Sequence, residues 1–161
     1  MKKSLTTMLL PLLLTACGVS LPDTIHIDAR APSHRIDRPE RGAEGLIRTA
    51  HGECLDIHGD DHRSLIRYRC HGQANQLFRW DARSGTIRQN EHCLDVAGGE
   101  TRDGSRVILF ACNGRDNQRW YADGGRIRSA ASGKCLDATG SYLAIRACDG
   151  SREQRFDWGG W

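Results

Sequence analysis

Proline is absent from residues 45–161, although the residues before them contain all four prolines of the chain. Because proline cannot donate a hydrogen bond to a neighbouring strand, its absence leaves every backbone donor available for strand pairing. The same residues also lack an apolar run of helical period. Their short apolar stretches alternate with clusters of Gly, Asp, Asn and Ser. We therefore expect an all-β region of strands joined by tight turns.

Lysine is nearly missing as well, with three lysines against 20 arginines and a formal net charge of +3. Lys2 and Lys3 lie in a segment that we expect to be removed, and the remaining charges almost balance. That balance gives no electrostatic reason to expect a nucleic acid partner. The sequence also lacks a Gly-x-Ser-x-Gly motif, a phosphate-binding loop and a zinc-protease helix. We expect no enzyme activity and no cofactor.

The first residues have the features of an export signal. A short positive start precedes an apolar run from Leu5 to Leu14, which is too short to span a bilayer. The run ends in Leu-Thr-Ala-Cys, which resembles the bacterial lipoprotein box. This resemblance implies a signal peptide over residues 1–16 and a lipid-modified Cys17, with palmitate-like acyl chains that anchor the protein in a membrane.

Residues 17–44 are expected to form the lipidated N-terminus and a disordered tether. From Gly18 onward they contain no aromatic residue, three prolines and many charges, so they cannot bury enough apolar area to offset the entropy of ordering. We expect a lipid-anchored protein of the cell envelope. In a Gram-negative cell, Gly18 rather than aspartate after the modified cysteine would favour the outer membrane.

Four markers recur three times in the same order over the rest of the chain. They are a Gly-x-Ile-Arg step at 40-residue intervals, a Cys-Leu-Asp triplet, a second cysteine and a Gln-x-aromatic step. A fixed period of this length indicates repeated supersecondary units that bury their apolar faces together. We expect the three glycines of the first marker, Gly45, Gly85 and Gly125, to form the turn that opens each repeat.

Six cysteines remain after Cys17, two in each repeat, and export would place them where disulfides persist. Fifteen pairings are possible, and repeat symmetry favours Cys54–Cys70, Cys93–Cys112 and Cys135–Cys148. Each would close a loop of about 15 residues, worth about 3 kcal/mol in the chain-entropy model. A zinc site is the weaker alternative, because close Cys-x-x-Cys pairs are missing.

Together these markers resemble the ricin B-type lectin domain, whose fold is a β-trefoil. The resemblance covers residues 45–161, and the middle copy, with Asn117-Gln118-Arg119-Trp120 at its end, is the fullest match. It implies three repeats of about four strands that close into a barrel. It also implies a core built from the glutamine and aromatic of each final marker, joined by the isoleucine and leucine of the earlier markers: Gln76, Gln118, Gln154, Phe78, Trp120, Phe156, Ile47, Ile87, Ile127, Leu55, Leu94 and Leu136.

The resemblance also implies a sugar site in each repeat. The site uses the aspartate of the triplet, an aromatic two residues before the second cysteine and the asparagine before the glutamine. The carboxylate and amide would hydrogen-bond sugar hydroxyls, and the ring would stack on the sugar. The first two repeats offer Asp56, Tyr68 and Asn75, and Asp95, Phe110 and Asn117. The third has Arg146 and Glu153 beside Asp137, and we expect no such sugar site there.

Two further features bear on the site. A polar residue commonly lies four positions before the second cysteine in this family, whereas this chain has Ile66, Ile108 and Ala144. Residues 58–62, His-Gly-Asp-Asp-His, are interpreted as a solvated loop rather than a metal or acid–base cluster, and we expect no metal.

The expected function is that of a membrane-anchored lectin-like lipoprotein that recognises galactose-type or related glycans. Two alternatives stay open. One is a cell-binding or interaction subunit of an assembly resembling the cytolethal distending toxins, with a toxin or envelope protein as its partner. The other is a trefoil interaction protein that has lost sugar binding.

Overall fold

The computed structural model describes residues 44–158. The predicted signal peptide, Cys17 and almost all of the predicted tether lie outside the described residues. Glu44, placed at the end of the tether by the sequence, is instead the first residue of strand β1. Within residues 44–158 there is no helix of the length and apolarity needed to cross a membrane.

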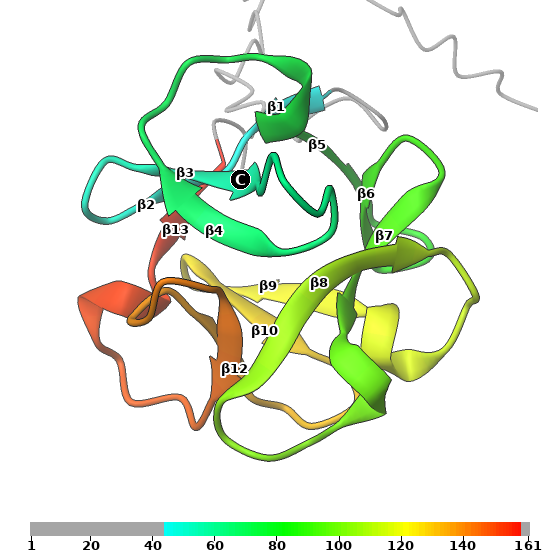
Figure 1. Cartoon of the computed structure of the whole chain (residues 1–161). Coiled ribbons are helices and arrows are strands. Elements are labelled where there is room, and N and C mark those ends of the chain that lie inside the picture. The colour runs from blue at the N-terminus through cyan, green and yellow to red at the C-terminus, as the bar shows by residue number, and fades with distance from the viewer. Residues whose placement is uncertain (1–43, 159–161) are drawn as a thin grey trace, which may run out of the picture. The chain divides into compact units, whose positions relative to one another are not determined.

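Short strands and four single-turn 3₁₀ helices make up the described chain (Figure 1). The strands are β1 (Glu44–Leu46), β2 (Arg48–Thr49), β3 (Cys54–Ile57), β4 (Leu65–Tyr68), β5 (Leu77–Asp81), β6 (Thr86–Gln89), β7 (His92–Val96), β8 (Ser105–Ala111), β9 (Trp120–Asp123), β10 (Arg126–Ser129), β11 (Cys135–Asp137), β12 (Ala144–Arg146) and β13 (Phe156–Asp157). The helices are η1 (Ala74–Gln76), η2 (Ala97–Gly99), η3 (Asp116–Gln118) and η4 (Arg152–Gln154).

Strand pairing repeats three times, as the sequence predicts. One sheet has the order β1-β5-β6-β7-β8-β12-β11-β10-β9, and a second has the order β13-β2-β3-β4. In each repeat an antiparallel hairpin carries the Cys-Leu-Asp triplet on its first strand, and the hairpins are β3–β4, β7–β8 and β11–β12. Their second strands β4, β8 and β12 approach one another near the centre of the view in Figure 1. This arrangement is the predicted β-trefoil.

The core is the one predicted from the repeats. Every isoleucine and leucine assigned to it is fully buried, and Phe78, Trp120 and Phe156 are at most 4% exposed. Trp120 also donates its indole N–H to the carbonyl of Leu94 at 3.0 Å, which satisfies its polar end inside the core. Trp158 packs on the same cluster from the C-terminal side.

The three predicted disulfides are present, joining Cys54 to Cys70, Cys93 to Cys112 and Cys135 to Cys148. Each links the start of a repeat's hairpin to the loop that follows it. A trefoil of about 115 residues has a small core, and three closed loops stabilise it mainly by restricting the unfolded chain.

The prediction that all three repeat-opening glycines form turns is wrong for one of them. Gly85 and Gly125 have φ angles of +70° and +82°, in the left-handed region that favours glycine. Gly45 instead lies inside β1, where an added Cβ would come within 3.0 Å of Trp158 Nε1. At this position glycine makes room for a packed ring.

Candidate functional site

Hairpin register places the predicted aspartate and aromatic of each site on one face. Asp56 pairs with Ile66, and Cys54, two residues earlier, pairs with Tyr68. Residues two apart on a strand point to the same side, so Asp56 and Tyr68 are diagonal neighbours, roughly 7–8 Å apart between Cα atoms. The β7–β8 hairpin places Asp95 and Phe110 in the same relation.

The aspartates of the triplets are buried and held by the glutamines of the final marker. Asp56, Asp95 and Asp137 are 3–4% exposed. Each accepts a hydrogen bond from the Nε2 of its repeat's glutamine, at 2.7, 2.7 and 3.1 Å for Gln76, Gln118 and Gln154.

These glutamines also form hydrogen bonds with the backbone. In the first repeat, Gln76 donates to the carbonyl of Arg69 and accepts from the amides of His71 and Gly72. The direct bond to the aspartate was not predicted. The constant order of triplet and glutamine was its only sequence signal, because the two lie about 20 residues apart and meet only in the folded repeat.

The first repeat gathers all three predicted side chains. Asn75 Nδ2 donates to Asp56 Oδ1 at 3.0 Å, and His71 Nε2 lies 3.2 Å from Asp56 Oδ2. Tyr68 is 51% exposed, and its ring lies edge-on to His71 with 6.0 Å between ring centroids. A carboxylate, an amide and an exposed ring therefore surround one spot on the surface. His71 was not identified from the sequence.

The middle repeat is similar but differs in two contacts. Asn117 donates to the carbonyl of Val96 at 3.2 Å, and the exposed ring of Phe110 lies 5.2 Å from the Arg63 guanidinium carbon. Arg63 comes from the first repeat, so this site is built by two repeats. Burial raises the pKa of Asp95 above its usual value, and hydrogen bonds from the Gln118 and Asn117 side chains oppose that rise.

The third repeat has the same hairpin with different side chains. Arg146 occupies the place of the aromatic, opposite Cys135, and its Nε lies 3.5 Å from Asp137 Oδ1. The same oxygen accepts the Thr139 amide at 2.9 Å. Glu153, in place of the asparagine, lies 3.3 Å from His51 Nε2.

Hydrogen bonding to its own backbone amide is the main cause that lowers the pKa of Glu153, and His51 adds to it. The negative charge of Asp137 opposes this lowering of the pKa of Glu153. The stacking surface expected of the other two repeats is missing at this position, as the sequence predicts.

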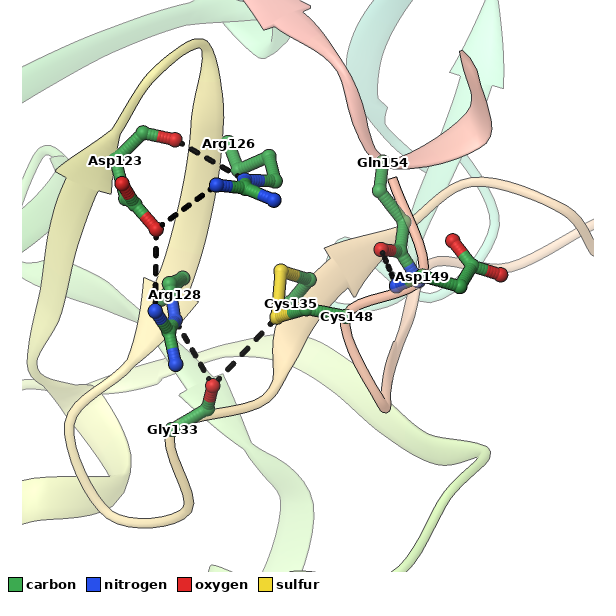
Figure 2. A network of polar contacts seen from close by, with 8 residues as sticks. All are labelled: Asp123, Arg126, Arg128, Gly133, Cys135, Cys148, Asp149 and Gln154. Atoms are coloured by element: carbon green, nitrogen blue, oxygen red, sulfur yellow. Dashed lines mark hydrogen bonds and ion pairs between the residues drawn. A yellow bond between two sulfur atoms is a disulfide. The ribbon is translucent and has the colours of Figure 1, made fainter. Parts of the chain in front are cut away.

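Arginines on the neighbouring β9–β10 hairpin are already paired, as Figure 2 shows. Asp123 Oδ2 accepts hydrogen bonds from Arg126 at 3.2 Å and from Arg128 at 3.1 Å. Arg128 also donates to the carbonyl of Gly133, beside the disulfide of this repeat. These two arginines stabilise the hairpin and its loop. Arg146, by contrast, lies beside the aspartate of the third repeat.

The loop at residues 58–62 folds on itself. Asp61 accepts from the amides of Arg63 and Ser64 and from the Ser64 hydroxyl, and these bonds, the hydroxyl first, hold the pKa of Asp61 well below its usual value. His62 has a φ of +47° and donates its amide to the carbonyl of His58 at 3.0 Å. Over residues 44–158, no three His, Cys, Asp or Glu side chains are grouped so that they could hold a metal ion.

Comparison with known proteins agrees with this geometry. Residues 43–156 match the family model of the ricin-type beta-trefoil lectin domain. The chain is also 33% identical, over 94% of its own length and 94% of the relative's, to the probable lipoprotein EnvE of Salmonella typhimurium.

Two further likenesses concern the trefoil alone. The chain is 35% identical over 78% of its length to polypeptide N-acetylgalactosaminyltransferase 5 of Caenorhabditis elegans, and the match covers 20% of that protein. It superposes with a TM-score of 0.66 on a non-toxic homologue of type II RIPs from Momordica charantia, solved in complex with α-methyl-D-galactoside. That likeness is 22% in identity and covers 76% of this chain and 49% of the other.

Proposed function

Because the chain belongs to the ricin-type beta-trefoil lectin family, we propose that it is a carbohydrate-binding lipoprotein of the cell envelope that acts without catalysis. The match to the transferase covers a fifth of that enzyme, so its name brings no catalytic activity to this chain. Two sites carry the proposed binding: Asp56, Tyr68 and Asn75, and Asp95, Phe110 and Asn117.

One observation supports this proposal above the others, namely the hydrogen bond from Asn75 to Asp56 beside a half-exposed Tyr68. The exposed ring of Tyr68 leaves apolar surface in contact with solvent. A sugar ring can cover that surface by stacking its C–H face on the aromatic ring. The fixed carboxylate accepts hydrogen bonds from two adjacent hydroxyls, while the amide oxygen of Asn75 accepts a third. The ordered pair lowers the entropy cost of binding.

The proposed ligand is a galactose-type or related sugar. The Momordica charantia homologue was solved with α-methyl-D-galactoside, which supports this class of ligand on a shared fold. The isoleucines opposite both aspartates add apolar surface next to the carboxylates. Such sites are individually weak, and two sites on one chain, with many chains on one membrane, would raise the overall avidity.

The proposed anchor is a lipid on Cys17, with release of residues 1–16. The sequence pattern around Cys17 and the likeness to a probable lipoprotein support it. In cells labelled with an alkyne fatty acid, the wild-type protein should carry the label and sediment with membranes, whereas Cys17→Ser should do neither. An unlabelled wild-type protein would contradict the anchor without touching the sugar sites.

Sugar binding is tested with the full-length protein in a detergent without a sugar headgroup, on a glycan array and then by calorimetry with methyl α-D-galactoside. Tyr68→Ala and Phe110→Ala should each weaken sugar binding at one site about tenfold, because the stacking ring of that site is lost. Both side chains are exposed, so the fold should persist.

Tyr121→Ala is the matched control. Tyr121 is 41% exposed on β9 and belongs to neither predicted site, and its removal deletes the same kind of ring. Binding should be unchanged. No glycan signal for the wild-type protein, or equal loss with Tyr121→Ala, would contradict the assigned sites.

A second candidate function is a trefoil interaction protein that binds no sugar. The observation that favours it is the pair of apolar residues, Ile66 and Ile108, directly opposite Asp56 and Asp95. With the aspartates held internally by glutamines, these positions also serve the fold alone. A negative glycan array together with specific capture of a purified envelope protein, abolished by Tyr68→Ala, would favour this candidate.

A further inference from the structure

The third repeat contains a surface hollow of about 350 Å³ at the position where the other repeats carry their predicted sites. Its lining residues include Asp137, Tyr142, Ala144, Arg106 and Arg146. A hollow of this volume accommodates a single sugar residue.

A small residue explains why the hollow opens in this repeat. Ala144 pairs directly with Asp137, where Ile66 and Ile108 pair with the aspartates of the other two repeats. Alanine has three fewer side-chain carbons than isoleucine. The space next to the aspartate is therefore filled by a branched side chain in the first two repeats and left open in the third.

The carboxylate in the hollow is already balanced by the protein. Asp137 accepts hydrogen bonds from the Gln154 side chain and the Thr139 amide, and Arg146 lies 3.5 Å away. Asp103, on which the charge of Arg146 also acts, is paired with Lys134. Two arginines and one lysine thus surround two aspartates, and the net charge around the hollow is positive.

Arg106 holds a fixed orientation. Its guanidinium lies 3.7 Å from the centre of the Tyr142 ring, and its Nη2 lies 3.5 Å from the Ser64 hydroxyl. Stacking fixes the plane of the guanidinium and leaves its edge available as a two-pronged donor. Arg106 pairs with Ala144 across the strands, so its side chain emerges on the face that carries Asp137.

The Arg146 guanidinium has N–H donors that are not used within the described chain. Its side chain is 47% exposed, and within residues 44–158 its only ion pair is with Asp137, reached through Nε. Its charge also helps to lower the pKa of Asp103. A guanidinium has five N–H donors, and the two terminal nitrogens of Arg146 form no hydrogen bond or ion pair within residues 44–158. Arg126 and Arg128 differ in this respect, since Asp123 and Gly133 occupy them.

We propose that the hollow between Arg106 and Arg146 binds an acidic sugar, one whose carboxylate is held by the two guanidinium groups while the ring lies over Ala144. Planar guanidinium groups match a carboxylate with parallel hydrogen bonds, and a charged acceptor makes these bonds roughly twice as strong as neutral ones. The inference rests on the proposed lectin function in taking the ligand to be a glycan. It assigns the third repeat a ligand class of its own.

The test compares methyl α-D-galacturonide with methyl α-D-galactoside, which differ by a carboxylate at C6, in calorimetry on the full-length protein. The galacturonide should occupy a site that the galactoside does not. Arg146→Gln and Arg106→Gln should each weaken that site about tenfold, the effect of losing a charge-assisted hydrogen bond. Rising salt should weaken it as well.

Arg119→Gln is the matched control, because Arg119 is 52% exposed and lies 3.3 Å from an aspartate, Asp116, outside the hollow. It should leave galacturonide binding unchanged. The inference is overturned if the two arginine substitutions in the hollow have no effect, or if Tyr68→Ala removes galacturonide binding instead. It is also overturned if inorganic phosphate or galactose 6-sulfate binds the hollow as tightly as the galacturonide does.

The two proposals fail separately. Loss of galactoside binding with retained, arginine-dependent galacturonide binding overturns the two neutral sites and supports the acidic one. Galactoside binding that depends on Tyr68 and Phe110, without any galacturonide site, supports the neutral sites and overturns the acidic one.

Discussion

The first and third repeats share a hairpin, a disulfide and a buried glutamine–aspartate pair, but different side chains surround the aspartate. In the first, Tyr68 and Asn75 present a ring and an amide, and Ile66 fills the space between the strands. In the third, the equivalent positions hold Arg146, Glu153 and Ala144, and a hollow with two arginines results.

This difference separates what the fold requires from what a ligand requires. Several inward positions carry the same residue in both repeats, as with Leu55 and Leu136, because both build one shared core. Other inward positions differ, since Ala138 in the third repeat stands where the first has Ile57. On the outward side of the same strands, exposed positions such as those of Tyr68 and Arg146 vary at little cost in stability. Membership of the lectin family therefore follows from the inward residues, and under the proposed function the ligand of each repeat would be decided by three or four outward ones.

The largest expected effect comes from removing the buried glutamine that both repeats share. Gln76→Ala and Gln154→Ala should each lower the stability of the folded protein. Each glutamine is fully buried and makes bonds to an aspartate and to the backbone. Removing it leaves several buried groups unsatisfied, so each variant should lose about 3 kcal/mol of unfolding free energy. Urea unfolding with the disulfides intact measures this loss.

Gln89→Ala is the control for these two variants. Gln89 is half-buried, with one 3.4 Å bond to the carbonyl of Ala74, and should lose no more than about 0.5 kcal/mol. A loss below about 1 kcal/mol in only one of the two repeats would contradict the view that both use the same scaffold.

An exchange of outward residues should produce an intermediate effect. Arg146→Tyr with Glu153→Asn gives the third repeat the ring and amide of the first. In a Tyr68→Ala, Phe110→Ala background, this exchange should improve galactoside binding about tenfold and remove galacturonide binding, because a ring replaces a cation. Calorimetry with both glycosides measures the result.

Adding Ala144→Ile to that exchange sharpens the comparison. The isoleucine should fill the hollow and bring the third repeat closer to the first, with a further gain for the galactoside. Unchanged preference for the galacturonide after all three substitutions would mean that Arg106 alone determines the ligand.

The smallest expected effect concerns the pH dependence of stability at Asp95. Burial raises its pKa in the folded protein, so the ionised carboxylate lowers stability at neutral pH. That cost is relieved as the pH falls through the folded pKa toward 3.8. Asp95→Asn keeps an acceptor for Gln118 and should gain stability over wild type at pH 7, with the gain shrinking toward pH 4. Thermal unfolding across this range measures it.

Asp61→Asn should change stability at pH 7 in the opposite direction to Asp95→Asn. Hydrogen bonds from Ser64 and Arg63 lower the pKa of Asp61, so its ionised form stabilises the fold above pH 3.8, and this contribution is lost as the pH falls further. The variant should be less stable than wild type at pH 7 and approach it below pH 3.8. Parallel pH profiles for the two variants would contradict the assigned causes.

Much of the fold could be predicted from the sequence because the same markers occur in each of the three repeats. The core positions and disulfide pairs each follow from a marker at a constant place in the repeat. Gly45 was misassigned because the first copy of the glycine packs against Trp158, a residue near the far end of the described chain. Spacing along a sequence carries no sign of such a contact.

The site was predicted only in the parts that one repeat contains. Tyr68, Asn75 and Asp56 belong to one unit and meet as expected, whereas Arg63 reaches Phe110 and Arg106 borders Asp137 from the preceding repeat. Contacts between repeats depend on how the units pack, which no marker encodes. A signal for the hollow was nevertheless present, since Ala144 is the smallest residue in a column of isoleucines.

The pairing of β13 with β2 has a consequence for how the protein is made. Phe156 lies opposite Thr49, so the last strand of the third repeat completes the sheet that the first repeat begins. A growing chain cannot close this sheet until nearly all of the trefoil has been synthesised, and contacts so distant in sequence form slowly. The β13–β2 pairing is therefore among the last contacts that a chain growing from its N-terminus can form, and it joins the two ends of the trefoil.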